Sequence, residues 1–260
     1  MNNAFALSGV VIKEMYRRKD FYVLFVMTAV VTLLLGSARF FDDDKIVRYI
    51  KDTCLLLIWI STLVMAITTA ARQIPAERES RTIFPLLAKP VSRWELILGK
   101  FLGCWLACGI TLVVFYLFFG LLTSSYEHTW PVLTFFQGLW LHWIFLAVVI
   151  ALVLLGSVVF TAPSSNATIC FIVVLGILFV GQHLHYVALG IRGIGGQIVT
   201  ALYFAIPHLE WYFEMRNLVI HDWGRIGWMF VAGATLYGAL YTGMLLGITW
   251  LVFRRKTLTL

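Results

Sequence analysis

Few residues in this sequence could do chemistry, and histidines stand out among them. His183 and His185 could bind a metal ion together with His208 or His221. Residues two apart lie on different faces of a helix, and no carboxylate is in register with this pair, so the spacing favours histidines near a water boundary over a metal site. His142 differs because it is the one ionisable residue that clearly lies inside a long apolar run. Ionisable residues there are energetically costly and often functional.

Motifs for binding a nucleotide or cleaving a peptide or ester bond are missing. The string nearest to a phosphate loop ends in Gly99-Lys100, but Phe101 stands where Ser or Thr must hold magnesium, and Trp94 replaces the first glycine. Residues 190–196 resemble such a loop only in their glycine content. Neither H-E-x-x-H nor G-x-S-x-G occurs. We therefore expect no catalytic site, no bound metal and no cofactor on this chain. If the protein works by ATP hydrolysis, another chain must supply the site for ATP and Mg²⁺.

Two further polar groupings have simpler interpretations. Cys104 and Cys108 share a helix face, and packing of small residues there is favoured over a metal or redox pair. Asp42, Asp43 and Asp44 could hold calcium, but the adjacent Lys45 opposes a site for a hard cation. The acidic run is more typical of a solvated loop.

The elements that must position these residues are membrane helices. The chain has 61% hydrophobic and 13% charged residues. Soluble chains are close to half apolar and about a quarter charged. A transmembrane helix needs about 20 mostly apolar residues, and the sequence offers six such runs. We expect an all-α polytopic protein that forms a single transmembrane domain. The predicted spans are 21–38, 53–71, 101–124, 138–162, 166–187 and 228–253, with a break at 163–165 between the fourth and fifth.

Basic residues predict the orientation of these spans. If the N-terminus is cytoplasmic, the inner segments hold 13 of the 20 Lys and Arg residues and the outer segments hold seven. Cytoplasmic loops carry the excess of basic residues, so both termini are predicted to lie in the cytoplasm, as in a bacterial-type inner membrane. This asymmetry also accounts for most of the net charge of +7 without a nucleic-acid partner.

Three segments lie outside the predicted spans. Residues 1–20 combine apolar positions with a basic cluster and predict an amphipathic helix at the inner interface. Residues 72–100 form a cytoplasmic linker of alternating charge. Residues 188–227 form an outer segment whose glycines and Pro207 interrupt it too often for a clean span. We expect short re-entrant or interfacial helices there, because irregular backbone at membrane depth must be shielded by protein.

The linker has local signals of its own. Ser92 and Glu95 match a capping box and predict the start of a helix that continues into the third span. Pro90 cannot continue a preceding helix, so a short helix at 83–88 should end in a sharp turn. The segment is either a solvated connector or a rigid knob that docks a cytoplasmic partner.

Small residues recur four apart in two of the spans. Such stripes allow helix backbones to approach closely. Packing within the chain is the first interpretation, and a dimer face is the alternative. The stripes are Gly99, Gly103 and Ala107 in the third span, and Ala239, Gly243 and Gly247 in the sixth.

The linker sequence E-R-E-S-R-T-I-x-x-L-L-A-K-P-V-S-R-x-E-x-x-x-G-K, residues 77–100, resembles the segment between the second and third spans in permease subunits of type-2 ABC exporters. Arg81 departs from the glycine that many members have before the threonine. The chain looks closer to the branch that includes nitrous-oxide-reductase maturation permeases, which the outer strings 206–210 and 216–219 also resemble. Outside the linker, the resemblance is one of topology.

The resemblance implies a division of labour. The linker would be a coupling helix in a cleft of a separate ATPase, the N-terminal helix would be an interface helix beside it, and two permeases with two ATPases would form the working unit. Phe84 and Leu87 would pack into the cleft, while the charged linker residues would bond to the ATPase or within the linker. The implied coupling residues are Glu77, Arg78, Glu79, Arg81, Thr82, Phe84, Leu87, Lys89, Pro90, Ser92, Arg93 and Glu95, and the interface helix contributes Glu14, Arg17 and Arg18.

The leading hypothesis is therefore the permease subunit of an ATP-driven exporter, as a homodimer or heterodimer. The apolar interior suggests a lipid, a lipid-linked glycan or a hydrophobic compound as substrate, and would also suit a mechanical role. An intramembrane lipid-modifying enzyme is one alternative, and a membrane assembly or scaffold protein is another. The enzyme would use His142, His183 and His185 with Glu127 or Glu210.

Overall fold

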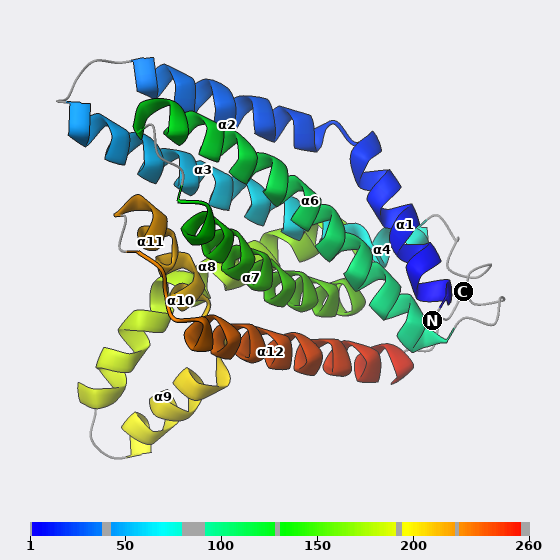
Figure 1. Ribbon diagram of the computed structural model, residues 1–260. Coiled ribbons are helices and arrows are strands. Elements are labelled where there is room, and N and C mark those ends of the chain that lie inside the picture. The colour runs from blue at the N-terminus through cyan, green and yellow to red at the C-terminus, as the bar shows by residue number, and fades with distance from the viewer. Residues whose placement is uncertain are drawn as a thin grey trace.

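A computed structural model describes residues 2–37, 43–79, 92–127, 131–190, 194–221 and 224–255. All regular secondary structure in these ranges is helical, as expected (Figure 1). The helices are α1 (Asn2–Arg17), α2 (Asp20–Ser37), α3 (Asp43–Arg72), α4 (Pro75–Glu79), α6 (Arg93–Glu127), α7 (Val132–Val159), α8 (Pro163–Gly190), α9 (Ile194–Ala205), α10 (Leu209–Glu214), α11 (Arg216–Ile220) and α12 (Trp228–Arg255).

Within the described ranges, five helices are long and apolar enough to cross a membrane. They correspond to five of the six predicted spans. The sixth, at 21–38, falls on α2, whose described apolar stretch Phe21–Leu34 is shorter than the roughly 20 residues that a span needs. A membrane-crossing role for α2 therefore stays a prediction. The five stretches are Val47–Glu77, Arg93–Glu127, Val132–Val159, Pro163–Gly181 and Trp228–Arg255.

Two helix boundaries differ from the expected ones for local reasons. Pro163 is the first residue of α8 rather than part of the break before it, and the turn lies at 160–162 instead. Proline suits the first helical position because the amide proton it lacks has no partner there. Asp43 and Asp44 belong to the first turn of α3 rather than to a loop, as acidic residues favour helix N-termini. Asp42 lies outside the described residues.

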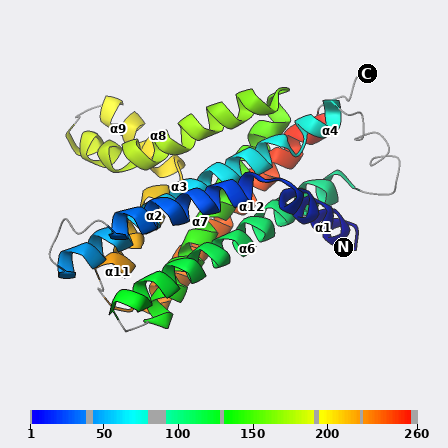
Figure 2. The same cartoon turned by 90° about the horizontal axis from the view of Figure 1, so that it is seen from above.

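The helices run between two ends of an elongated bundle (Figures 1 and 2). The terminal end is defined here by α1, α4, the first turn of α6 and the last turn of α12. The far end is defined by the first turns of α3, the last turn of α6, and α11. An ion pair joins α3 or α4 to α6 near each end: Lys51 with Glu127 at 2.6 Å, and Glu77 with Lys100.

The spacing of these two ion pairs matches a lipid bilayer. Lys100 and Glu127 lie on the same continuous helix, α6. At 1.5 Å per residue they are separated by about 40 Å along its axis. A bilayer with its headgroup regions is about 40–45 Å thick. The two ion pairs therefore lie where the two headgroup layers would be.

Helix α7 is central in the bundle and contacts α3, α6, α8, α10, α11 and α12. In its apolar stretch 78% of the residues are buried, against 22% in α8 and 28% in α12. Trp105 and Trp143 join α6 to α7, because their stacked indoles lie 4.3 Å apart and each Nε1 donates to the backbone oxygen of the other residue. The outer faces of α8 and α12 need lipid or another protein surface to cover them.

Candidate functional site

The candidate site is the terminal end of the bundle, where the linker leaves α4 and returns to α6. The predicted short helix at 83–88 lies outside the described residues, as do Arg81, Thr82, Lys89 and Pro90. The side chains of Arg78 and Glu79 are also outside the described part, although their backbone belongs to α4. Only the two ends of the linker can therefore be placed.

The predicted capping box is confirmed at the start of α6. The Ser92 backbone N–H donates to Glu95 Oε2 at 2.9 Å, and the Glu95 N–H donates to Ser92 Oγ at 3.2 Å. Each side chain thus satisfies a backbone donor that the first helical turn would otherwise leave free. The cap therefore defines where α6 begins.

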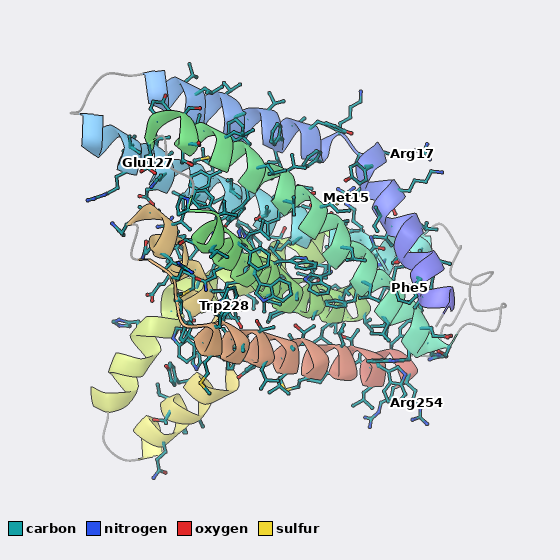
Figure 3. All side chains as sticks on the ribbon, in the orientation of Figure 1. Phe5, Met15, Arg17, Glu127, Trp228 and Arg254 are labelled. Atoms are coloured by element: carbon teal, nitrogen blue, oxygen red, sulfur yellow. The ribbon has the colours of Figure 1, made fainter. Side chains whose placement is uncertain are left out.

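Arg93 fastens the first turn of α6 to the last turn of α12. Its Nη1 donates to the backbone oxygens of Phe253 at 2.9 Å and Arg254 at 3.0 Å, and its guanidinium lies 5.5 Å from the Phe253 ring centroid. Figure 3 shows Arg254 at this end of α12, beside the start of α6. The last carbonyls of a helix lack intrahelical partners and attract cations. The described contacts of Arg93 are thus with α12, and its predicted bonding to the ATPase or within the linker stays a prediction.

We expect Arg93→Ala to weaken this fastening without unfolding the protein. The cation at the end of α12 should stabilise it by about 1 kcal/mol, since the contact is partly solvent-exposed. Hydrogen–deuterium exchange of the backbone amides in the last turn of α12 should therefore accelerate. Lys13→Ala, which removes an exposed charge from α1, is the matched control. Equal exchange in the two variants would show that Arg93 does not hold α12.

Glu77 and Lys100 close the linker at its base. Lys100 follows the Gly99 of the linker motif and is only 6% exposed, yet its ammonium group pairs with the Glu77 carboxylate of α4. A buried charge without a partner would cost several kcal/mol, so this pairing explains how a lysine is tolerated at the edge of a span. The ion pair lies within the linker, which is one of the two arrangements we expected for Glu77.

The two small-residue stripes have different surroundings. A side chain at Gly99 would collide with Ala4 and Leu7 of α1, and one at Gly103 would collide with Ser8 and Val11. The α6 stripe therefore packs against α1 within the chain. In α12, by contrast, a β-carbon at Gly243 or Gly247 would meet nothing within 4 Å, and Ala239 is exposed.

Helix α1 presents its other face away from α6. Phe5 is 59% exposed, Glu14 and Arg17 are exposed, and Arg18 is half-buried in the turn before α2. Figure 3 shows Phe5 and Arg17 at opposite ends of α1, at the margin of the bundle. The amphipathic pattern of residues 1–20 was thus a correct guide to a helix with one packed and one open face.

Among the described side chains, those of the enzyme hypothesis lie in separate surroundings. His142 is fully buried in α7, where Nε2 lies 3.0 Å from Thr62 Oγ1 and the ring stacks on Trp59 at 3.8 Å. Glu127 instead pairs with Lys51 at the far end, as Figure 3 shows for its position on α6. His183 is exposed, and the side chain of His185 lies outside the described residues. His142 and Glu127 therefore have different partners at different places in the bundle.

Glu210 is buried beside a histidine that the enzyme hypothesis did not include. His208 Nδ1 lies 3.1 Å from Glu210 Oε1, and the carboxylate rests against Gly181 of α8. Trp211 stacks on the His208 ring at 4.9 Å, and Tyr203 lies 4.3 Å from it. The sequence placed His208 among candidate metal ligands, but within the described ranges no three His, Cys, Asp or Glu side chains are grouped to hold a metal ion.

Comparison with known protein families gives one match. A family model described as "ABC-2 family transporter protein" matches residues 43–253. The matched region begins at α3 and includes α4, both described ends of the linker, and the five helices that could cross a membrane. No curated protein matches the chain.

Proposed function

Because the chain belongs to the ABC-2 family of transporter proteins, and is thus a multi-pass membrane permease that works with an ABC ATPase subunit, we propose that it is the permease of an ATP-driven exporter. The observation that carries this proposal is the family match over residues 43–253 together with five apolar helices in the same region. The direction of transport, outward from the cytoplasm or the inner leaflet, belongs to the proposal. So does its place in the branch of the nitrous-oxide-reductase maturation permeases.

The proposal places the ATPase against the linker. Glu77–Lys100, the Ser92–Glu95 capping box and Arg93 fix both ends of the linker to the bundle. A displacement of the residues between those ends would therefore also move α3, α6 and α12. Closure of the ATPase on ATP would then shift the equilibrium between two arrangements of these helices.

A pair of permeases with a pair of ATPases is the proposed working unit. The α6 stripe is already covered by α1, whereas Gly243 and Gly247 of α12 are open. Close approach of a second copy along α12 would cover an apolar face in the way that small residues permit. The second copy could be this chain or a homologous one.

The proposed orientation puts the terminal end in the cytoplasm of a bacterial-type cell, with α2 as a sixth span and α1 as an interface helix. The excess of basic residues in the segments at that end supports it, 13 against seven. The far end, with α9, α10 and α11, then faces outward. The ATPase needs cytoplasmic ATP, so the linker must lie on this side.

The substrate is proposed to be a lipid, a lipid-linked glycan or another hydrophobic compound. A cavity of about 550 Å³ between α7, α10 and α12 supports this class, because apolar and aromatic residues dominate its lining. Its size falls in the range of about 300–1,000 Å³ that is typical of ligand sites. The lining includes Leu141, Trp211, Tyr212, Met229, Phe230 and Tyr237.

ATP hydrolysis by the purified chain tests the division of labour. The sequence has no phosphate loop, so we expect no hydrolysis by the chain alone and hydrolysis after the ATPase subunit is added. Transport into inverted vesicles should then require both subunits. Hydrolysis that stays with this chain through repurification would contradict the proposal, and ATP hydrolysis without any transport would favour the scaffold alternative.

A further inference from the structure

A cavity of about 410 Å³ has charged and polar side chains from α3 and from the α11 region in its lining. The two helices contact each other at the far end of the bundle (Figure 1). The coupling role of the terminal end makes no use of this cavity. Its polar lining consists of Arg48, Tyr49 and Asp52 from α3 with Arg216, Asn217 and His221 from α11 and the residue after it.

Arg216 is held in place but keeps hydrogen-bonding capacity. Its guanidinium lies 4.4 Å from the Phe213 ring centroid, so the ring occupies one flat face. Its Nη1 is 3.5 Å from Asp52 Oδ1, close enough for an ion pair, yet among the described residues this nitrogen has no hydrogen-bond partner. A guanidinium stacked on a ring directs its N–H groups edgewise, where they match the oxygens of a phosphate or carboxylate.

The described residues that line the cavity carry an excess of one positive charge. Arg48 is exposed and has no carboxylate partner in the described part of the chain. Asp52 is half-exposed and is the only carboxylate among the described residues that line the cavity, so it offsets one of the two guanidinium groups. The nearby Lys51 does not change this balance, because it is buried and pairs with Glu127. The cavity therefore attracts anions.

The depth of the cavity favours the phosphate of a lipid headgroup as the anion. Arg48 and Asp52 lie within one helical turn of Lys51, at the level of the Lys51–Glu127 pair. That pair lies about 40 Å from Lys100 along α6, which is the depth of the headgroups in the leaflet at the far end. Met215, which precedes Arg216, lines the separate apolar cavity of about 550 Å³. A lipid phosphate would thus meet the guanidinium groups while apolar lining lies close by.

We propose that this basic cavity is a binding site for a phosphate group, in which Arg216 and Arg48 donate hydrogen bonds to the phosphate oxygens and Asn217 assists. The site goes beyond the exporter function and does not depend on it. The phosphate can belong to an anionic lipid headgroup or to a small soluble anion, and both present the same oxygens to the two arginines.

The test is calorimetric titration of the full chain in detergent. The probes are dioctanoyl phosphatidylglycerol, inorganic phosphate, and dioctanoylglycerol, which has the acyl chains without the phosphate. We expect dioctanoyl phosphatidylglycerol to bind and dioctanoylglycerol not to bind. If millimolar inorganic phosphate displaces the phospholipid, the site binds small anions in general. If it does not displace the phospholipid, the site is specific for a lipid headgroup.

Substitutions of the two arginines that line the cavity test whether the phosphate binds there. Arg216→Gln and Arg48→Gln should each weaken binding about tenfold or more, the usual loss for a hydrogen bond to a charged group. Arg216→Lys should be intermediate, since it keeps the charge without the paired donors. Arg225→Gln is the matched control, because Arg225 is exposed and does not line the cavity. Arg48 is exposed, so its variant stays informative even where Arg216→Gln impairs folding.

Three outcomes would overturn the proposal. The first is that neither phosphatidylglycerol nor inorganic phosphate binds to the wild-type chain. The second is that the Arg48 and Arg216 variants keep the affinity of the wild type, as the Arg225 control does. The third is that all three variants lose affinity equally. The last result would mean that binding follows the net charge of the surface rather than this cavity.

Discussion

Lys100→Glu should destabilise the protein by at least about 3 kcal/mol. Removing one partner of a buried ion pair costs about 3–5 kcal/mol, and this change also places two carboxylates together. Lys100 is only 6% exposed, so water cannot screen the repulsion well. The effect should appear as a lowered midpoint of thermal unfolding in detergent and as a loss of monodisperse protein.

The controls for this variant separate the ion pair from a general effect of charge. Lys13→Glu makes the same change on the exposed face of α1 and should leave the unfolding midpoint nearly unchanged. The exchange of both partners, Glu77→Lys with Lys100→Glu, should recover part of the lost stability. An unfolding midpoint for Lys100→Glu equal to that of Lys13→Glu would show that the pair does not stabilise the base of the linker.

Features that depend on neighbours in the sequence could be predicted well. Ser92 and Glu95 are three residues apart, so their mutual hydrogen bonds follow from helix geometry alone. The five helices that are long and apolar enough to cross a membrane follow from the length and apolar composition of each run. Pro163 was misplaced because proline both breaks a helix and suits its first turn, and the sequence pattern did not decide between these roles.

Contacts between distant residues could not be predicted in the same way. Lys100 stands at the edge of an apolar run, and its partner could have been any of several acidic residues of the linker. Arg93 reaches backbone oxygens near the end of α12, and backbone oxygens leave no mark in a sequence. The His208–Glu210 pair was visible as an i, i+2 spacing, yet its burial against Gly181 depends on how α8 and α10 pack.

Leu87→Asp should abolish the functional contact with the ATPase. Leu87 lies outside the described residues, in the linker between the fixed ends at Glu77 and Ser92. Burial of a leucine side chain contributes about 1.5–3 kcal/mol, and an aspartate in an apolar contact adds a desolvation cost. The affinity for the ATPase should therefore fall by at least tenfold. The variant should still insert in the membrane, because residue 87 lies outside every apolar span.

Two further variants make the result specific. Leu87→Met keeps an apolar side chain of similar volume and should preserve binding, since such exchanges usually cost less than 1.5 kcal/mol. Ser92→Ala removes the helix cap at the end of the linker and should weaken coupling mildly, because the loss of a cap costs roughly 0.5–2 kcal/mol.

The central claim is that this permease is driven by a separate ATPase bound to its linker. The most direct test measures two quantities, the co-purification of the two subunits and the rate of ATP hydrolysis by the complex. Wild type and Leu87→Met should retain the ATPase and stimulate its hydrolysis, while Leu87→Asp should retain neither property. If Leu87→Asp holds the ATPase and supports hydrolysis and transport as the wild type does, residues 80–91 are only a connector and the claim is wrong.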